Sequence, residues 1–357
     1  MPQTPLHATH ENLGATFTDF GGWEMPLKYG SELEEHRAVR TDVGIFDLSH
    51  MGEITVQGLD AAAFLDYALI SNFTALKDGK AKYSMIVAED GGIIDDLITY
   101  RFSENHFMVV PNAANTNAVW AAFEARKGDF EVQLTNNSEA FALVAVQGPK
   151  SLDVLKPLLS DDASALSYYS SAWMTLDGVE TIVARTGYTG EDGFELFCTR
   201  EDAQKVWDAV IGSGTPCGLA ARDSLRLEAS MPLYGHELTS EITPVEAGMG
   251  RAFAKKEADF VGKEALTGRA PSVVIAGLTS EQRRAARAGA EVFLAGSDEK
   301  IGVVTSGQPS PTLGHPVALA HLDPPHAELG TDVEIDIRGR RYPFTIAPTP
   351  FYSREDA

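Results

Sequence analysis

The amino-acid sequence predicts an α+β fold up to about residue 250, followed by an all-β domain in the rest of the chain. Between residues 54 and 250, segments rich in β-branched and aromatic residues alternate with segments of helical periodicity. Beyond about residue 270 the helical periodicity disappears, and short β-rich runs recur at regular spacing. With 357 residues, the chain is long enough for two or three domains with separate cores.

The first 111 residues predict two helices and a three-stranded meander. Ser31 can cap a helix from Glu32 to Arg40, because a serine hydroxyl accepts a hydrogen bond from a backbone N–H of the first turn. A second helix is expected from Ala61 to Tyr67. Three β-rich runs are separated by turn residues that are typical of hairpins. These runs are residues 82–87, 93–102 and 106–111.

The remaining elements follow the same two periodicities. Helices are expected over residues 115–127, 150–159, 201–211 and 219–229. Strands are expected over residues 130–134, 141–147, 179–185 and 193–197. The last part of the chain predicts strands over residues 273–278, 291–294, 300–305, 316–321, 332–337 and 341–346. Short strands at such even spacing favour a closed barrel or a sandwich.

The composition is that of a globular protein with a large excess of negative charge. The chain has 29 Lys and Arg against 51 Asp and Glu, which gives a formal net charge of −22. This charge repels phosphate and argues against nucleic acid as the main partner. No apolar run approaches the ~18 residues that cross a bilayer, and the first residues lack the pattern of a secretory signal. We therefore expect no membrane partner and a cytoplasmic location.

Several kinds of catalytic and metal centre lack their sequence signatures. The two cysteines, Cys198 and Cys217, are too few for a disulfide framework or a four-ligand metal site. The histidines have no carboxylate or thiol at a ligand spacing, so no metal site is expected. Neither a Gly-x-Ser-x-Gly motif nor a Gly-x-Gly-x-x-Gly motif after a strand is present. What remains is chemistry by carboxylate, aromatic and arginine side chains on a bound organic cofactor.

Two adjacent acids, Asp95 and Asp96, lie inside a β-rich run. Alternate side chains of a strand face opposite sides, so each acid shares its face with the aliphatic residues two positions away. A carboxylate in an apolar setting costs free energy unless it is hydrogen-bonded or has a task such as holding an amine donor. The alternative is that both acids are solvated or stabilise the hairpin.

Two further polar clusters are candidate ligand sites. The segment from Arg185 to Glu195 contains three glycines, but no Gly-Lys-Ser/Thr follows, so it is not a phosphate loop. Tyr188 could stack on a flat ligand, and Glu195 could accept paired donors from an aminopyrimidine edge; a long hairpin with incidental polar residues is the alternative. Arg222 and Arg226 lie one helical turn apart, where they could hold a carboxylate or form ordinary salt bridges within the helix.

Taken in order, these and other motifs resemble the aminomethyltransferase (T-protein) family of the glycine cleavage system. The matching motifs are Thr4-Pro5-Leu6, Phe20 to Leu27, Gly44 to Gly52, Gly91 to Tyr100, Val146 to Pro149, Arg185 to Glu195, Gly218 to Glu228, Thr305-Ser306-Gly307 and Ser310 to Gly314. Each motif is weak alone, but their order over essentially the whole chain is specific.

The resemblance implies a fold of three domains around a central folate channel, the last of them a β-barrel. It divides the chain into a split folate-binding domain 1 (residues 1–53 with 141–249), an inserted α+β domain 2 (54–140) and a barrel domain 3 (250–357). The implied reaction transfers a one-carbon unit from the aminomethyl-lipoyl group of the partner H-protein to the co-substrate tetrahydrofolate and releases ammonia, without a metal.

The resemblance also implies the roles of individual site residues by their position in the motifs. Asp96 would be the catalytic carboxylate and would hydrogen-bond a folate nitrogen. Tyr188 and Glu195 would contact the pterin, and Arg222 would hold a polar group of the folate. The other implied pocket residues are Met51, which would line the apolar wall, Tyr83, Tyr100 and Asn112.

Relatives with the same fold leave other functions to be weighed. A folate-dependent iron–sulfur and tRNA maturation factor carries a cysteine where this chain has Gly187, which argues against that function. A folate-dependent demethylase of a sulfonium or N-methyl compound would keep the pterin pocket and lose the entrance for the lipoyl arm. A non-enzymatic folate-binding module would be expected to have lost Asp96.

The net charge of −22 also bears on the partner that the resemblance implies. H-proteins are usually acidic, so the two proteins would repel each other at long range unless basic residues gather where they dock. Lys255-Lys256 and the group Arg338 to Arg341 are the candidates for this docking face.

Overall fold

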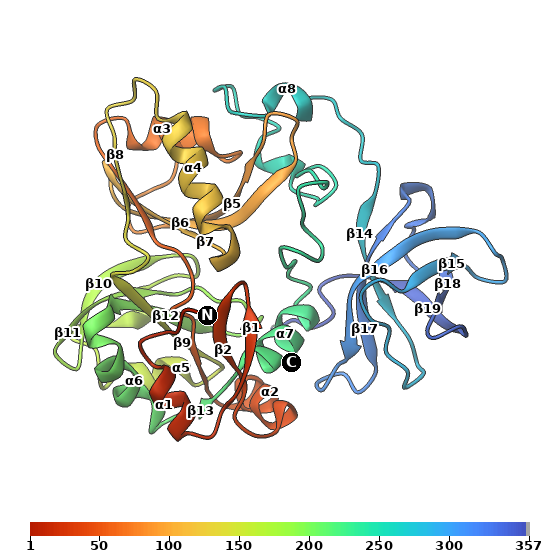
Figure 1. Ribbon diagram of the computed structural model, residues 1–357, viewed down its shortest axis with the longest axis horizontal. Coiled ribbons are helices and arrows are strands. Elements are labelled where there is room, and N and C mark those ends of the chain that lie inside the picture. Colours follow the sequence, from red (N-terminus) through yellow and green to blue (C-terminus); the bar gives the residue numbers. More distant parts are fainter. Residues whose placement is uncertain (355–357) are drawn as a thin grey trace. The chain divides into compact units, whose positions relative to one another are not determined.

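In the computed structural model, which describes residues 1–354, the chain forms two compact units. Figure 1 colours the chain from the N-terminal elements in red to the last barrel strands in blue. Unit 1 comprises residues 1–86, 94–222 and 256–261, and it contains two large β-sheets with their covering helices and a small two-stranded sheet. Unit 2 comprises residues 87–93, 223–255 and the chain from Gly262 onward, and it contains a closed β-barrel. Mixed helices and sheets followed by a barrel confirm the predicted fold class.

The first sheet of unit 1 has five strands in the order β5-β6-β7-β4-β8. They are β4 (Ile54–Gln57), β5 (Ala81–Val87), β6 (Ile93–Ser103), β7 (His106–Pro111) and β8 (Gln133–Asn136). Helices α3 (Ala61–Ala68) and α4 (Thr116–Arg126) cover one face, where Phe64 and Phe123 pack against Leu97 and Val109. The turn residues that the sequence places between β5, β6 and β7 thus do separate neighbouring strands of one sheet.

The pleat of β6 sends the two adjacent acids to opposite faces of this sheet. Asp95 shares the helix-covered face with Leu97 and is fully buried. Asp96 lies on the other face together with Tyr100 and remains half-buried. One acid therefore sits in an apolar setting, and the other faces the second sheet of unit 1.

The second sheet of unit 1 has six strands in the order β10-β11-β12-β9-β3-β13. They are β3 (Gly44–Asp47), β9 (Phe141–Gln147), β10 (Ser171–Leu176), β11 (Val179–Ala184), β12 (Gly193–Thr199) and β13 (Thr215–Pro216). Helices α5 (Ser151–Leu155) and α6 (Ala203–Ile211) pack on one face through Leu155 and Trp207. On the other face, Phe197 of β12 meets Tyr100 of β6 with ring centroids 5.5 Å apart, so the two sheets contact each other here.

The N-terminal elements of unit 1 are α1 (His7–Asn12), the antiparallel pair β1 (Thr16–Phe20) and β2 (Trp23–Lys28), and α2 (Glu32–Thr41). The hydroxyl of Ser31 accepts a hydrogen bond from the backbone N–H of Glu34, as the capping prediction requires. A buried chain of polar groups joins α1 to β3, since His10 lies 2.9 Å from Asp47 and 2.8 Å from the Tyr29 hydroxyl.

The barrel of unit 2 closes in the strand order β14-β17-β16-β15-β18-β19. Its strands are β14 (Val274–Thr279), β15 (Glu291–Leu294), β16 (Lys300–Pro309), β17 (Pro316–Leu322), β18 (Asp332–Asp336) and β19 (Arg341–Ala347). Apolar side chains such as Leu278, Val304, Val333 and Phe344 fill the interior. Closure leaves no strand with an unpaired edge, which explains how such short strands are stable.

The remaining helical elements are short, apart from α7 (Leu219–Glu228). They are α8 (Lys263–Leu266) and 3₁₀ turns at Ala113–Asn115, Ala163–Ala165, Arg200–Asp202, Gly250–Ala252 and Pro324–His326. Within residues 1–354, no helix is both long enough and apolar enough to span a membrane.

Several predicted elements differ from the structure in their bounds; β16, for example, continues to Pro309, four residues beyond the prediction. The helix expected over residues 150–159 ends at Leu155, because the following chain turns back and the Ser160 N–H donates to the Thr175 carbonyl on β10. The strand expected over residues 130–134 begins only at Gln133, opposite Gln57. Phe130 instead packs its ring against Phe64, so its apolar character serves the core rather than the sheet ladder.

Candidate active site

The carboxylate of Asp96 is held by two hydrogen-bond donors. The Tyr83 hydroxyl donates to Oδ2 at 3.0 Å, and the Asn112 side-chain amide donates to Oδ1 at 2.9 Å. Burial raises the pKa of Asp96 to about 6, although both hydrogen bonds act to lower it. Asp96 is therefore an oriented acid whose proton exchanges close to neutral pH, as a general base requires.

Asp95 supports this arrangement from the opposite face of β6. Its carboxylate accepts hydrogen bonds from the Asn112 backbone N–H (2.9 Å), the Asn112 amide (2.8 Å) and the Asn115 amide (2.7 Å). Burial, followed by the charge of Asp96, raises the pKa of Asp95 to about 7. Asp95 thus fastens the segment between β7 and α4, and this segment places Asn112 against Asp96.

A second polar group lies where the two sheets of unit 1 meet. The Tyr100 hydroxyl donates to Glu195 Oε2 at 3.2 Å and lies 3.0 Å from the hydroxyl of Thr186, which also donates to Glu195 Oε2. Burial raises the pKa of Tyr100 well above its ordinary value, so the phenol keeps its proton. Sequence reasoning did not single out Thr186, because its importance comes only from facing Glu195 in the folded chain.

The aromatic ring of Tyr188 and the guanidinium of Arg222 stack on each other. The guanidinium carbon lies 4.9 Å from the ring centroid, within the range of a cation–π contact. Burial lowers the pKa of Arg222, while the charge of Glu195 opposes this change. Arg226, the neighbour one turn away, is instead buried in unit 2 and pairs with Asp223 (2.8 Å) and Glu237 (3.0 Å). The salt-bridge alternative therefore holds for Arg226 and not for Arg222.

Tyr169 is a further site residue that sequence reasoning missed. Burial raises its pKa above the ordinary value, and the charges of Tyr168, Glu195 and Asp96 add to the rise. Tyr169 is thus within electrostatic range of both acids. Its backbone has a φ of 59°, which is uncommon for a residue other than glycine. No sequence pattern indicates such a conformation.

The segment that carries Met51 approaches the same region. Met51 is half-buried just after β3, and its backbone N–H donates to the Leu48 carbonyl at 3.0 Å. The adjacent His50 is buried against Phe20, with ring centroids 5.6 Å apart. Burial, and after it the positive charge of Arg222, lowers the pKa of His50 to about 4, so this imidazole is neutral at pH 7.

The glycine-rich segment after β11 is fixed by the buried side chain of Gln147. The Gln147 amide nitrogen donates to the carbonyls of Thr186 (3.1 Å) and Phe194 (3.4 Å), and the Thr189 hydroxyl donates to its oxygen at 2.9 Å. A Cβ atom at Gly187 would lie 2.1 Å from that same oxygen. A side chain at position 187, such as the cysteine of the maturation factor, would therefore have to displace the buried Gln147 side chain.

Two predictions about other polar residues can be compared with the structure. Both cysteines are buried, and burial raises the pKa of Cys198 to about 12, which makes its thiol unreactive. Within residues 1–354, no group of three His, Cys, Asp or Glu side chains is arranged to hold a metal ion.

Lys256 is not the exposed docking cation that the sequence suggested. It is buried, and its ammonium group donates to the backbone carbonyls of Asp66, Leu69 (2.8 Å) and Ser71 (2.7 Å). The prediction was wrong because a charged side chain was assumed to be solvated. Lys255, its neighbour in the chain, is exposed.

The chain matches two family models that together span most of its length. Residues 6–257 match the family model of the GCVT N-terminal domain, and residues 274–353 match that of the glycine cleavage T-protein C-terminal barrel domain. The chain belongs to the glycine cleavage T-protein family. An aminomethyltransferase of Corynebacterium aurimucosum is 60% identical over 365 residues, which cover 99% of this chain and 98% of the relative. One from Streptomyces avermitilis is 52% identical with the same coverage.

A solved structure of the family has the same fold as this T-protein chain. The crystal structure of the glycine cleavage system aminomethyltransferase T from Bartonella henselae aligns with a TM-score of 0.93 at 37% identity and covers 99% of this chain and 98% of that one. Membership over the full length confirms the predicted family and the enzyme class, an aminomethyltransferase of glycine cleavage. It does not favour the demethylase alternative.

Proposed function

We propose that this chain transfers the one-carbon unit of an aminomethyl-lipoyl group, carried by the H-protein of glycine cleavage, to tetrahydrofolate with release of ammonia. The single observation that carries the proposal is the carboxylate of Asp96, oriented by Tyr83 and Asn112 on the face of β6 that looks toward the second sheet. The three-domain division and the cytoplasmic location remain predictions that accompany this proposal.

We assign to Asp96 the role of positioning the folate nitrogen that attacks the sulfur-bound methylene carbon. Two folate nitrogens replace the sulfur and the amine on this carbon, so the carbon–sulfur bond and the carbon–nitrogen bond to the amine break. The two folate N–H protons leave on the dihydrolipoyl thiol and on ammonia.

As a carboxylate, Asp96 accepts a hydrogen bond from the attacking nitrogen and takes up part of the proton as the new carbon–nitrogen bond forms. Both donors are already in place on its two oxygens, so the carboxylate loses little freedom when the ligand binds. Positioning and partial proton transfer of this kind typically contribute ~10²–10⁴-fold to the rate.

We assign the pterin contacts to the second polar group. Glu195 Oε2 already accepts hydrogen bonds from Tyr100 and Thr186. Its Oε1 accepts none from residues 1–354 and is free to accept the paired N–H donors of an aminopyrimidine edge. The ring of Tyr188 offers a flat face to the pterin, and Arg222, which stacks on this ring and is within electrostatic range of Glu195, supplies positive charge for a polar group of the folate.

We also propose that the H-protein is the partner and that exposed basic residues form the face on which it docks. Of the basic residues named from the sequence, Lys255, Arg338 and Arg340 are exposed and retain the expected role. Arg341 is half-buried, and its guanidinium lies 3.3 Å from Asp298. Lys256 is excluded by its burial.

The proposal is tested by Asp96→Asn in an assay with tetrahydrofolate and aminomethylated H-protein that follows ammonia release. We expect folate binding to persist and turnover to fall by about 10²-fold or more. Glu89→Gln, which neutralises an exposed acid outside the site, is the control and should keep normal turnover. Near-normal turnover of Asp96→Asn would show that Asp96 is a structural acid and that another group positions the folate.

A further inference from the structure

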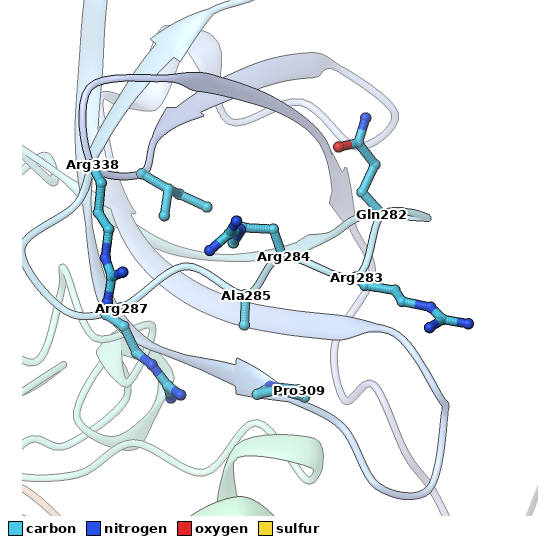
Figure 2. A pocket seen from close by; sticks show the side chains of 8 residues that line it. Gln282, Arg283, Arg284, Ala285, Arg287, Pro309 and Arg338 are labelled. Atoms are coloured by element: carbon cyan, nitrogen blue, oxygen red, sulfur yellow. The ribbon is translucent and has the colours of Figure 1, made fainter.

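A cavity lined by four arginines lies at the barrel of unit 2 and is called here the arginine groove. Its volume is about 610 Å³. The lining residues are Gln282, Arg283, Arg284, Ala285, Arg287, Pro309, Ile337 and Arg338 (Figure 2). They come from the segment between β14 and β15, the end of β16 and the connection between β18 and β19. The residues assigned to the folate and to the transfer step all belong to unit 1, and among the lining residues only Arg338 is shared with the proposed docking face.

The four arginines of the groove have no acidic partners. Within residues 1–354, no carboxylate oxygen lies within 4.0 Å of a guanidinium nitrogen of Arg283, Arg284, Arg287 or Arg338. This is unexpected in a chain with a net charge of −22, where acidic side chains are abundant. Arg341 shows the contrast, because it pairs with Asp298 at 3.3 Å. Like charges gathered without counterions repel one another, and an anionic ligand would relieve that repulsion.

Parts of the groove are already arranged before any ligand binds. The Arg287 guanidinium donates to the Gly307 carbonyl at 3.0 Å, and the Arg284 guanidinium lies 5.8 Å from the ring centroid of Tyr342. In Figure 2, Arg284 extends toward the side on which Arg338 lies, whereas Arg283 points the other way. Arg338 occupies a left-handed conformation with a φ of 58° in the turn after β18. Two of the four guanidinium groups, those of Arg284 and Arg287, are therefore held by contacts within the chain.

The chemistry of the lining defines the kind of ligand. A guanidinium group binds a carboxylate or a phosphate through two parallel hydrogen bonds, and several such groups select a molecule with several anionic groups. The volume falls within the roughly 300–1,000 Å³ that is usual for small-molecule sites. Ala285, Pro309 and Ile337 add apolar contact for a short carbon skeleton. We propose that the arginine groove binds a small organic polyanion with at least two carboxylate or phosphate groups.

The test is calorimetric titration of the full-length chain at low ionic strength with citrate as the carboxylate probe and pyrophosphate as the phosphate probe. We expect one of them to bind at one site per chain, and the affinity to fall as salt screens the charges. The double variant Arg284→Gln/Arg338→Gln should weaken binding at least about tenfold, because each lost guanidinium removes charge-assisted hydrogen bonds. Arg251→Gln, an exposed arginine outside the groove, is the matched control and should change the affinity less than about twofold.

Three results would overturn the proposal. The first is that neither probe binds to the unaltered chain even at low salt. Arg251→Gln could weaken binding as much as the groove variant does, which would indicate a general charge effect. Finally, poly-glutamate could bind through the groove while neither small probe does, which would make it a protein-docking surface. Thermal unfolding of each variant is recorded alongside the titration. If the double variant proves to be unfolded, Arg283→Gln/Arg338→Gln replaces it.

Discussion

The hydrogen bond from Tyr83 to Asp96 should set the pH at which this enzyme begins to work. Tyr83→Phe keeps the ring and removes the hydroxyl that donates to Asp96 Oδ2 at 3.0 Å. This hydrogen bond lowers the pKa of Asp96, whereas burial raises it to about 6. A hydrogen bond to a charged group contributes about 1.5–3 kcal/mol, and one pKa unit corresponds to about 1.4 kcal/mol. The variant should therefore raise the pKa of Asp96 by about 1–2 units.

The sign of the effect follows from the form of Asp96 that the proposal requires. The carboxylate accepts the folate N–H, so the rate falls as the pH drops through the pKa of Asp96. In the unaltered chain the acid limb of kcat/KM should lie near pH 6, and in Tyr83→Phe it should lie about 1–2 units higher. The assay is ammonia release between pH 5 and 9. Tyr67→Phe, which removes a hydroxyl elsewhere in unit 1, should leave the limb in place.

An unchanged acid limb in Tyr83→Phe would refute this reasoning, because the titrating group would then not be the acid that Tyr83 contacts. A shift to lower pH would refute it as well. Asp95 titrates in the same range and feels the charge of Asp96, so the limb reports the pair rather than a single residue. The expected direction is the same for the pair, since the lost hydrogen bond stabilised negative charge.

Three further predictions concern the free energy of unfolding, measured by urea denaturation. Folding raises the pKa of Asp96 above the unfolded value of 3.8, so the protonated acid favours the folded state below about pH 4, and this contribution is lost as the pH rises through about 6. Asp96→Asn should therefore be more stable than the unaltered chain by up to about 3 kcal/mol at pH 8, and equally stable at pH 4. Gly187→Ala should destabilise the chain by about 1–3 kcal/mol through its contact with Gln147, and adding Gln147→Ala should cost less than the sum of the two changes. Lys256→Met should cost about 2–5 kcal/mol because three buried carbonyls lose their donor, whereas the exposed Lys255→Met should change stability by less than about 0.5 kcal/mol.

Local sequence chemistry defines those elements that begin and end at turn residues. Strands β7 (His106–Pro111) and β9 (Phe141–Gln147) have the predicted bounds, because Asn105 and Gly148 stand directly beside them. Strand β2 was missed, since Pro26 inside it is usually a sign against a strand. Strand β3 was missed because four residues beginning with a glycine form a strand only through pairing with β9 and β13.

The sequence predicted those features of the site that follow from the alternation of side chains along a strand or from a family motif. Alternation along β6 placed Asp95 and Asp96 on opposite faces, but which face the helices cover is decided by packing far along the chain. Thr186 and Tyr169 could not be found, because their roles arise from contacts with residues on other strands. For Lys256 the sequence predicted a role that the structure does not support. Its charge was expected to be solvated, but the ammonium group is buried and donates to three carbonyls.

The side-chain amide of Asn112 has two hydrogens and three acceptors within bonding distance, namely Asp95 Oδ1, Asp96 Oδ1 and the Asp96 carbonyl. The two hydrogens cannot serve all three oxygens at once, and Asp95 Oδ1 has a second donor in the Asn115 amide at 2.7 Å. A slight tilt of the Asn112 amide decides how far it serves Asp96. Asn112 stands just before the turn into α4, whose packing fixes that tilt. The position of helix α4 therefore bears on the basicity of Asp96. Substitutions along this helix would retune the working pH of the enzyme without altering any residue assigned to the ligand.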